Sequence, residues 1–267
     1  MTFPARRILV PDDFGPASCR AWEWARRFAA LGATLESLFV YEMLPAPVMA
    51  LPAPPLSPRL KKDLLARMRE ERPDATDWSV EEGDTVSAIL RRSRRADLVV
   101  LGTHGRTGLA RAAFGSVAEA VMRESPVPVL VARGAPSGER TVLAPVNLQP
   151  YALQGLLLAA EAAAFLGAEL VLLHISPPGV RGGNPRYVIN ALLERVPKEL
   201  REKVRPRLIL RGGDPIPAIL AESGKHGLLV LTAHRKSLLG DLVLGTTVER
   251  VVRHADVPVL AAPSAER

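Results

Sequence analysis

The chain has 267 residues, 48% of them hydrophobic and 4% aromatic, which suits one large or two ordinary domains with cores of Ala, Leu and Val. One cysteine, Cys19, excludes an internal disulfide framework and is typical of a reducing compartment. No apolar run reaches the ~18 residues that a membrane-spanning helix needs, and the start lacks a secretion-signal pattern. We therefore expect a cytoplasmic protein.

The formal net charge is +7, which admits an anionic partner. The basic residues are, however, mixed with acidic ones along helix-like segments such as 59–72. No basic stretch is interleaved with aromatic residues, as a base-stacking surface requires. The composition therefore argues against nucleic acid as the main partner.

The first half of the chain alternates between strand-like and helix-like segments. Pro16 suits the first turn of a helix, and Gly32 is its expected stop. The Pro-rich segment at 45–58 reads as a surface excursion. In chain order, we expect a strand at 8–11, a helix at 16–31, a strand at 35–41, a helix at 59–72, a strand at 78–82, a helix at 86–94, a strand at 98–101, a helix at 116–124 and a strand at 127–132.

The second half repeats the first. GDTVSAIL at 83–90 returns as GDPIPAIL at 213–220, and LVVLGTH at 98–104 returns as LLVLTAH at 228–234, an offset of 130 residues. Nearer the start of each half the offset is 134 to 135 residues, because the connectors differ in length. A repeat this long indicates a duplicated domain. We predict domains at 1–136 and 137–267, joined by a linker at 134–140.

Alternating strands and helices predict α/β domains, each with a parallel sheet covered by helices on both faces. Ligands of such open sheets bind beyond the carboxyl ends of the strands. In the first repeat, two segments meet there: PDDFG at 11–15 and the glycine-rich loop LGTHGRTGLARAAFG at 101–115.

The glycine-rich loop leads into a helix that begins near Ser116. The free N–H groups and positive dipole end of that helix favour an anion. Gly102 and Gly105 allow backbone to approach a phosphate chain closely, and Gly115 and Ser116 add backbone donors and a hydroxyl. The P-loop motif is absent from the chain, and the dinucleotide-binding glycine motif belongs after the first strand rather than here.

The spacing Gly102-x2-Gly105-x9-Gly115-Ser116, with ILVPDDF at 8–14 and THGRTGL at 103–109, resembles the ATP-binding signature of the universal stress protein family. The resemblance covers nearly the whole chain, twice. The chain is thus similar to a tandem universal stress protein.

The resemblance implies five-stranded parallel sheets of order 3-2-1-4-5, with ATP, alone or together with Mg²⁺, across the switch point. The last strand of each repeat would pair with its counterpart, so that the two domains form a pseudo-dimer within the chain; a homodimer of whole chains stays open. By motif match, the nucleotide-binding positions implied are Pro11, Asp12, Asp13, Val40, Leu101, Gly102, Thr103, Gly105, Arg106, Gly115, Ser116 and Val117.

The chemistry of these residues fits those roles. Asp13 can accept a hydrogen bond from a ribose hydroxyl or an adenine amino group, although a turn or helix cap is an alternative role. Arg106 can reach phosphate. Asp12 is expected to face solvent. His104 is a poor candidate for a catalytic base, because no nucleophile with a partner acid is evident near it.

The second repeat keeps the order of the elements but differs from the first at the nucleotide-binding positions. Asn147 stands at the position of Asp13, Thr232 at that of Gly102 and Arg235 at that of Gly105. Only Gly245 and Thr246 keep the end of the signature. We expect the second repeat to bind nucleotide weakly or not at all and to serve mainly as the partner of the first.

Three functions remain compatible with the sequence. The favoured one is an ATP-binding stress or signalling module without enzymatic activity. A slow ATPase is second, although no residue is evident that positions the attacking water. A nucleotide-independent scaffold or nucleic-acid binder is third.

Overall fold

The computed structural model of the chain describes residues 5–42, 55–103, 115–134, 136, 140–149, 151–179, 183–233, 235–238, 241–244 and 246–263. Most of the Pro-rich excursion lies outside the described residues, as do His104, Gly105 and Arg106. Among the described residues, no helix is both long and apolar enough to cross a membrane.

Every element expected in the first repeat is present, with bounds within two residues of the prediction. Helix α1 begins with Pro16 in its first turn, and Gly32 follows its end with φ +95°. The elements are β1 (Arg7–Pro11), α1 (Pro16–Ala29), β2 (Thr34–Tyr41), α2 (Pro58–Glu71), β3 (Asp77–Glu82), α3 (Thr85–Ser93), β4 (Leu98–Gly102), α4 (Ser116–Glu124) and β5 (Val129–Ala132).

The second repeat follows the same order with two differences. Two helices, α6 and α7, occupy the place of α2, and a hairpin, β10–β11, follows β9 where a loop was expected. The elements are β6 (Thr141–Pro145), α5 (Ala152–Leu166), β7 (Glu169–Ser176), α6 (Pro185–Glu194), α7 (Lys198–Val204), β8 (Arg207–Gly212), α8 (Pro215–Ser223), β9 (Leu228–Ala233), β10 (Arg235–Leu238), β11 (Asp241–Leu244), α9 (Thr246–His254) and β12 (Val259–Pro263).

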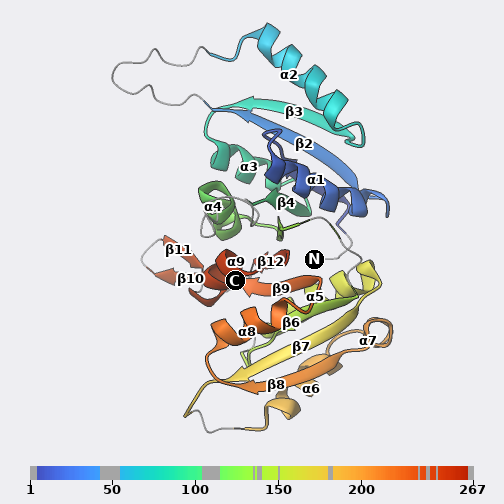
Figure 1. Cartoon of the computed structure of the whole chain (residues 1–267), viewed down its shortest axis with the longest axis vertical. Helices are drawn as coiled ribbons and strands as arrows, with labels where there is room; N and C mark the ends of the chain where they lie inside the picture. Colours follow the sequence, from blue (N-terminus) through green and yellow to red (C-terminus); the bar gives the residue numbers. More distant parts are fainter. Residues whose placement is uncertain are drawn as a thin grey trace.

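One sheet of ten strands runs through both repeats in the order β3-β2-β1-β4-β5-β12-β9-β6-β7-β8 (Figure 1). Each half therefore has the predicted order 3-2-1-4-5, and its strands are parallel. The halves join where β5 and β12 pair antiparallel, with Leu130 opposite Leu260. The predicted pairing of the two last strands within the chain, and hence the pseudo-dimer, is confirmed.

Both faces of the sheet are buried, which explains why its central strands read as nearly unbroken apolar runs. Ile8 and Val10 belong to the core on the side of α1 and α5, whereas Leu9 between them belongs to the core on the side of α4 and α9. Ala, Leu and Val dominate these cores, as expected from the composition, and the indoles of Trp22 and Trp24 add bulk on the α1 side.

Contacts outside the sheet also join the repeats. Arg253 of α9 pairs with Glu119 of α4 at 3.0 Å. Arg133, just after β5, donates to the carbonyl of Val252 at 2.6 Å and to that of Arg253 at 3.3 Å. A cation at the carboxyl end of a helix is favoured by unpaired carbonyls and by the helix dipole.

Candidate functional site

The candidate site lies where β1 and β4 end. The two strands are neighbours in the sheet, with Ile8 opposite Leu98 and Leu9 opposite Val99. The chain leaves β1 for α1 on one face of the sheet and leaves β4 for α4 on the other. In open α/β sheets, such a reversal marks the usual ligand site, a crevice beyond the carboxyl ends of the strands.

Helix α4 presents its amino end to this side of the sheet. Its N-cap is Gly115, and no side chain among the described residues caps it. Ser116, the first residue of the helix, is exposed. The first N–H groups of a helix have no partner inside it, so this end offers several donors and a partial positive charge.

The two aspartates after β1 have different environments. Asp13 is exposed, and among the described residues its Oδ1 accepts only a local bond, from the N–H of Gly15 at 2.9 Å. The expectation that Asp12 faces solvent is wrong, because this residue is 4% exposed. Asp12 Oδ2 accepts from Arg72 Nε at 2.6 Å, and Oδ1 accepts from Arg72 Nη2 at 3.2 Å. Its carboxylate is therefore engaged inside the protein, whereas that of Asp13 is accessible.

A stacked platform borders the site and consists of two aromatic rings, Phe14 and Phe39, with the guanidinium of Arg67 over the first. Phe14 has φ +61°, a conformation uncommon for a bulky residue, and its N–H donates to Asp12 Oδ1 at 2.8 Å. Its ring stacks on Phe39 with centroids 5.3 Å apart, and the Arg67 guanidinium carbon lies 3.9 Å from its centroid. Sequence reasoning missed Arg67, since no local motif links it to Phe14.

Gly102 ends β4 at the same edge, and the close approach that it permits is to helix α1. A Cβ at this position would lie 1.8 Å from the carbonyl oxygen of Ala17. The neighbouring Thr103 is buried, and its carbonyl accepts from Arg20 Nη2 at 2.7 Å. Glycine at 102 thus serves the packing of β4 against α1 directly.

The remaining predicted positions frame the crevice. Pro11 ends β1, and Val40 lies near the end of β2, the neighbour of β1. Leu101 is buried in the core on the α4 side, and Val40 and Val117 are partly buried against it. These residues come from adjacent strands and from α4, so the structure brings their elements to one edge of the sheet.

The corresponding edge of the second repeat differs in its contacts. Asn147 donates to the hydroxyl of Tyr151 at 2.9 Å and accepts from the N–H of Gln149 at 3.2 Å. Thr232 carries a side chain where Gly102 has none, and helix α5 accommodates it with Gly155: a Cβ there would lie 1.7 Å from Thr232 Oγ1. At this contact between strand and helix, the first repeat has its glycine in strand β4, whereas the second repeat has its glycine in helix α5.

Gly155→Ala is expected to destabilise the chain by about 2 kcal/mol, because the added methyl overpacks the contact with Thr232. In the double variant with Thr232→Gly, most of that loss should disappear. Urea unfolding followed by circular dichroism measures both effects. A cost for Gly155→Ala that is unchanged in the Thr232→Gly background would contradict the contact.

Comparison with known proteins agrees with this architecture. The universal stress protein family profile (Usp) matches residues 4–133 and again 139–263. The universal stress protein MJ0531 of Methanocaldococcus jannaschii is 30% identical over 141 residues, 48% of this chain and 82% of that protein. Rv2005c of Mycobacterium tuberculosis, also a universal stress protein, is 26% identical over 192 residues, 66% of this chain and 65% of that protein.

A solved universal stress protein from Archaeoglobus fulgidus superimposes with a TM-score of 0.77 at 20% identity, covering 98% of this chain and 100% of that one. At that identity the likeness establishes the fold. A doubled α/β domain, with its two halves joined in one sheet, is thus the class of protein found here. The two profile matches show that the chain belongs to the universal stress protein family, with two Usp domains in tandem.

Proposed function

We propose that the chain binds an adenine nucleotide, with ATP as the first candidate, in the crevice of the first repeat. It would act as a stress or signalling module whose contacts with partners depend on the nucleotide state. The observation that carries this proposal is that two groups lie on the same edge of the sheet, where the neighbouring strands β4 and β1 end: the amino end of α4, which no described side chain caps, and the accessible carboxylate of Asp13.

Each group has a complementary task. The helix end and Ser116 would hold phosphate oxygens through N–H and hydroxyl donors. Asp13 would accept from a ribose hydroxyl or the adenine amino group. The buried ion pair of Asp12 and Arg72 would not contact the nucleotide but would fix the turn that carries Asp13. Mg²⁺ would neutralise the phosphates; the described residues include no cluster of three or more metal-ligating side chains, so the phosphates would supply most of its ligands.

The second repeat would serve mainly as structural partner. Asn147 is engaged by Tyr151 and Gln149, and the Thr232 side chain occupies the space against Gly155. The accessible carboxylate and the glycine that mark the first crevice both have different counterparts here. We therefore propose one nucleotide per chain.

Calorimetric titration of Mg-ATP into the full chain tests the proposal, with a pair of variants at one position. Gly115→Trp places an indole at the amino end of α4 and should abolish binding. Gly115→Ala is the matched control, since its Cβ meets nothing within 4 Å and φ is −59°, so binding should persist. Asp13→Ala should weaken binding about tenfold or more through the loss of a charge-assisted hydrogen bond.

The expected stoichiometry is one site per chain. Two sites would contradict the assignment of the second repeat. No binding by the wild-type chain, or equal binding by the Gly115→Trp variant, would refute the proposed crevice.

A further inference from the structure

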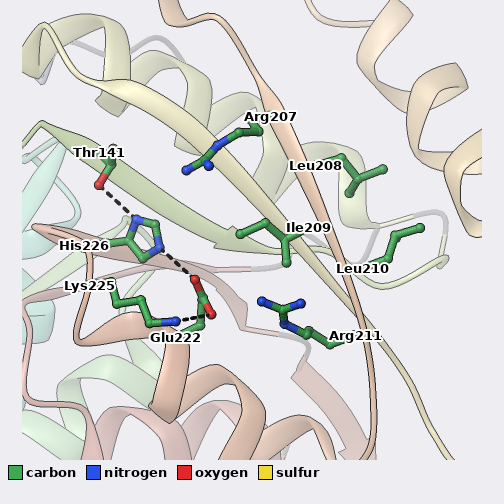
Figure 2. Close-up of a pocket in the computed structure, with 9 residues that line it drawn as sticks. All are labelled: Thr141, Arg207, Leu208, Ile209, Leu210, Arg211, Glu222, Lys225 and His226. Carbon is green, nitrogen blue, oxygen red and sulfur yellow. Dashed lines mark hydrogen bonds and ion pairs between the residues drawn. The ribbon is translucent and has the colours of Figure 1, made fainter.

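A second candidate site lies in the second repeat, away from the crevice and from its counterpart. A cavity of about 570 Å³ opens between the edge strand β8, the first residue of β6 and the end of α8 (Figure 2). Thr141, which lines it, begins β6, so the cavity reaches the amino end of that strand. The nucleotide crevice of the first repeat lies at carboxyl ends, so the two are distinct.

One wall of the cavity is the edge strand. Arg207, Ile209 and Arg211 alternate along β8, so they share one face of the sheet. Figure 2 shows both arginine side chains extending from the strand toward His226 and Glu222. Neither guanidinium forms an ion pair or hydrogen bond with any described residue. Their charge is therefore available to a ligand.

The opposite wall is a group of interacting polar side chains at the end of α8. Lys225 Nζ lies 3.0 Å from Glu222 Oε2, and His226 Nε2 lies 3.7 Å from Glu222 Oε1. His226 Nδ1 is 2.9 Å from the hydroxyl of Thr141, which leaves Nε2 buried without a hydrogen bond among the described residues. Burial lowers the pKa of His226, and Arg207 and Lys225 lower it further against the opposing effect of Glu222.

The charges of this cavity do not balance. Arg207, Arg211 and Lys225 are cations, Glu222 is the one carboxylate lining it, and burial favours the neutral form of His226. A multivalent anion would restore the balance.

At the corresponding place in the first repeat, the charges of strand and helix are paired. Asp77 stands at the position of Arg207 and Glu81 at that of Arg211, because Glu36 pairs with Asp77 in the same register as Val171 with Arg207. Glu81 is bound by Arg91 and Arg92 of α3, and Arg92 also pairs with Glu36 at 3.0 Å. Acidic strand residues thus face basic helix residues there.

In the second repeat that pattern is reversed and incomplete. Glu222 replaces Arg92, so strand and helix exchange charges, but Val171 replaces Glu36 and Ala221 replaces Arg91. His226 stands where the first repeat has Ala96. Charged residues on an edge strand also discourage sheet-to-sheet pairing, and either sign serves that purpose. That purpose requires neither a cavity nor a buried imidazole opposite the strand.

We propose that this cavity binds a small phosphorylated anion, held by Arg207 and Arg211 from the strand and by Lys225 and His226 from the end of α8. Guanidinium groups match phosphate oxygens in bidentate geometry, and Arg is the usual residue for such recognition. The site is independent of the nucleotide crevice, and a ligand here would be a second input to the same chain.

Calorimetric titration of inorganic pyrophosphate into the full-length Gly115→Trp variant tests this site with the nucleotide crevice blocked. One pyrophosphate per chain is expected, with affinity reduced at least 30-fold in the further variant Arg207→Ala/Arg211→Ala. Both arginines are exposed, so the thermal midpoint should be unchanged. The matched control, Arg195→Ala/Lys203→Ala, removes two exposed charges, one from the residue that follows α6 and one from α7, on the other face of the sheet, and should bind like its parent.

Three results would overturn the site. No binding by the parent variant would remove it, and an equal loss in the control pair would reduce it to general attraction by net charge. Citrate binding as tightly as pyrophosphate would refute recognition of phosphate. Success or failure here leaves the Mg-ATP result for the wild-type chain untouched, so the two proposals can fail separately.

Discussion

Asp12→Ala is expected to lower the free energy of unfolding of the chain by about 3–5 kcal/mol, the usual cost of removing one partner of a buried ion pair. Arg72 would keep a guanidinium that is 8% exposed, and its remaining partners among the described residues would be the Glu71 carbonyl, Cys19 Sγ and, at 3.9 Å, the Glu71 carboxylate. The N–H of Phe14 would lose its acceptor as well. The loss therefore combines a buried cation left with weaker partners and a loosened turn.

The double variant Asp12→Val/Arg72→Met should recover most of that loss, because replacing a whole buried pair by apolar groups is often neutral or stabilising. The second repeat shows that an apolar residue is accommodated at the first of these positions, since Val146 stands at the position of Asp12 and is buried in the apolar core. Urea unfolding measured by tryptophan fluorescence suits the test, since all three tryptophans lie in the first repeat. A double variant less stable than Asp12→Ala alone would contradict it.

Gly102→Ala is expected to destabilise the chain by about 3 kcal/mol, at the upper end for overpacking. The new methyl would lie 1.8 Å from the carbonyl oxygen and 2.2 Å from the carbonyl carbon of Ala17, both backbone atoms. Side-chain rotation cannot relieve such a contact, so α1 would have to move away from β4. The displaced start of α1 would also disturb the turn that carries Asp13, so nucleotide binding should weaken too.

Gly115→Ala is the matched control for the same measurement, because an added Cβ there meets nothing within 4 Å. Its stability should stay within about 0.5 kcal/mol of wild type, as is usual for a substitution without a packing conflict. Fluorescence-detected urea midpoints separate the two glycine variants. Equal midpoints would show that the approach of Ala17 does not constrain position 102.

The fold could be predicted from the sequence because the repeat supplied every strand of the main sheet twice and the buried central strands are continuous apolar runs. The β10–β11 hairpin was missed. Its two strands are four residues each, and the comparison with the glycine loop of the first repeat favoured a loop there. Leu239 and Gly240 separate the two runs, and Leu-Gly is not one of the residue pairs typical of a two-residue hairpin turn, so the local hairpin signal in the sequence is weak.

The candidate site was predictable where local chemistry suffices. The glycine before α4 and the accessible Asp13 follow from motifs that are contiguous in the chain. The burial of Asp12 was not predictable, because its partner Arg72 is 60 residues away and their meeting depends on where α2 ends. The contact of Arg67 with the ring of Phe14 could not be predicted for the same reason, because the two residues are far apart in the sequence.

The pairing of β5 with β12 has a consequence for how this protein can evolve. In a two-fold dimer of identical subunits, every substitution at the interface occurs twice, in symmetric positions. A covalent link lifts that restriction and also replaces concentration-dependent assembly by a fixed effective concentration. Arg253 reaches Glu119 across the junction, whereas its symmetry counterpart Arg123 pairs with its own neighbour Glu124. Joining two domains in one chain lets one repeat keep an inherited task while the other acquires a charge pattern of its own.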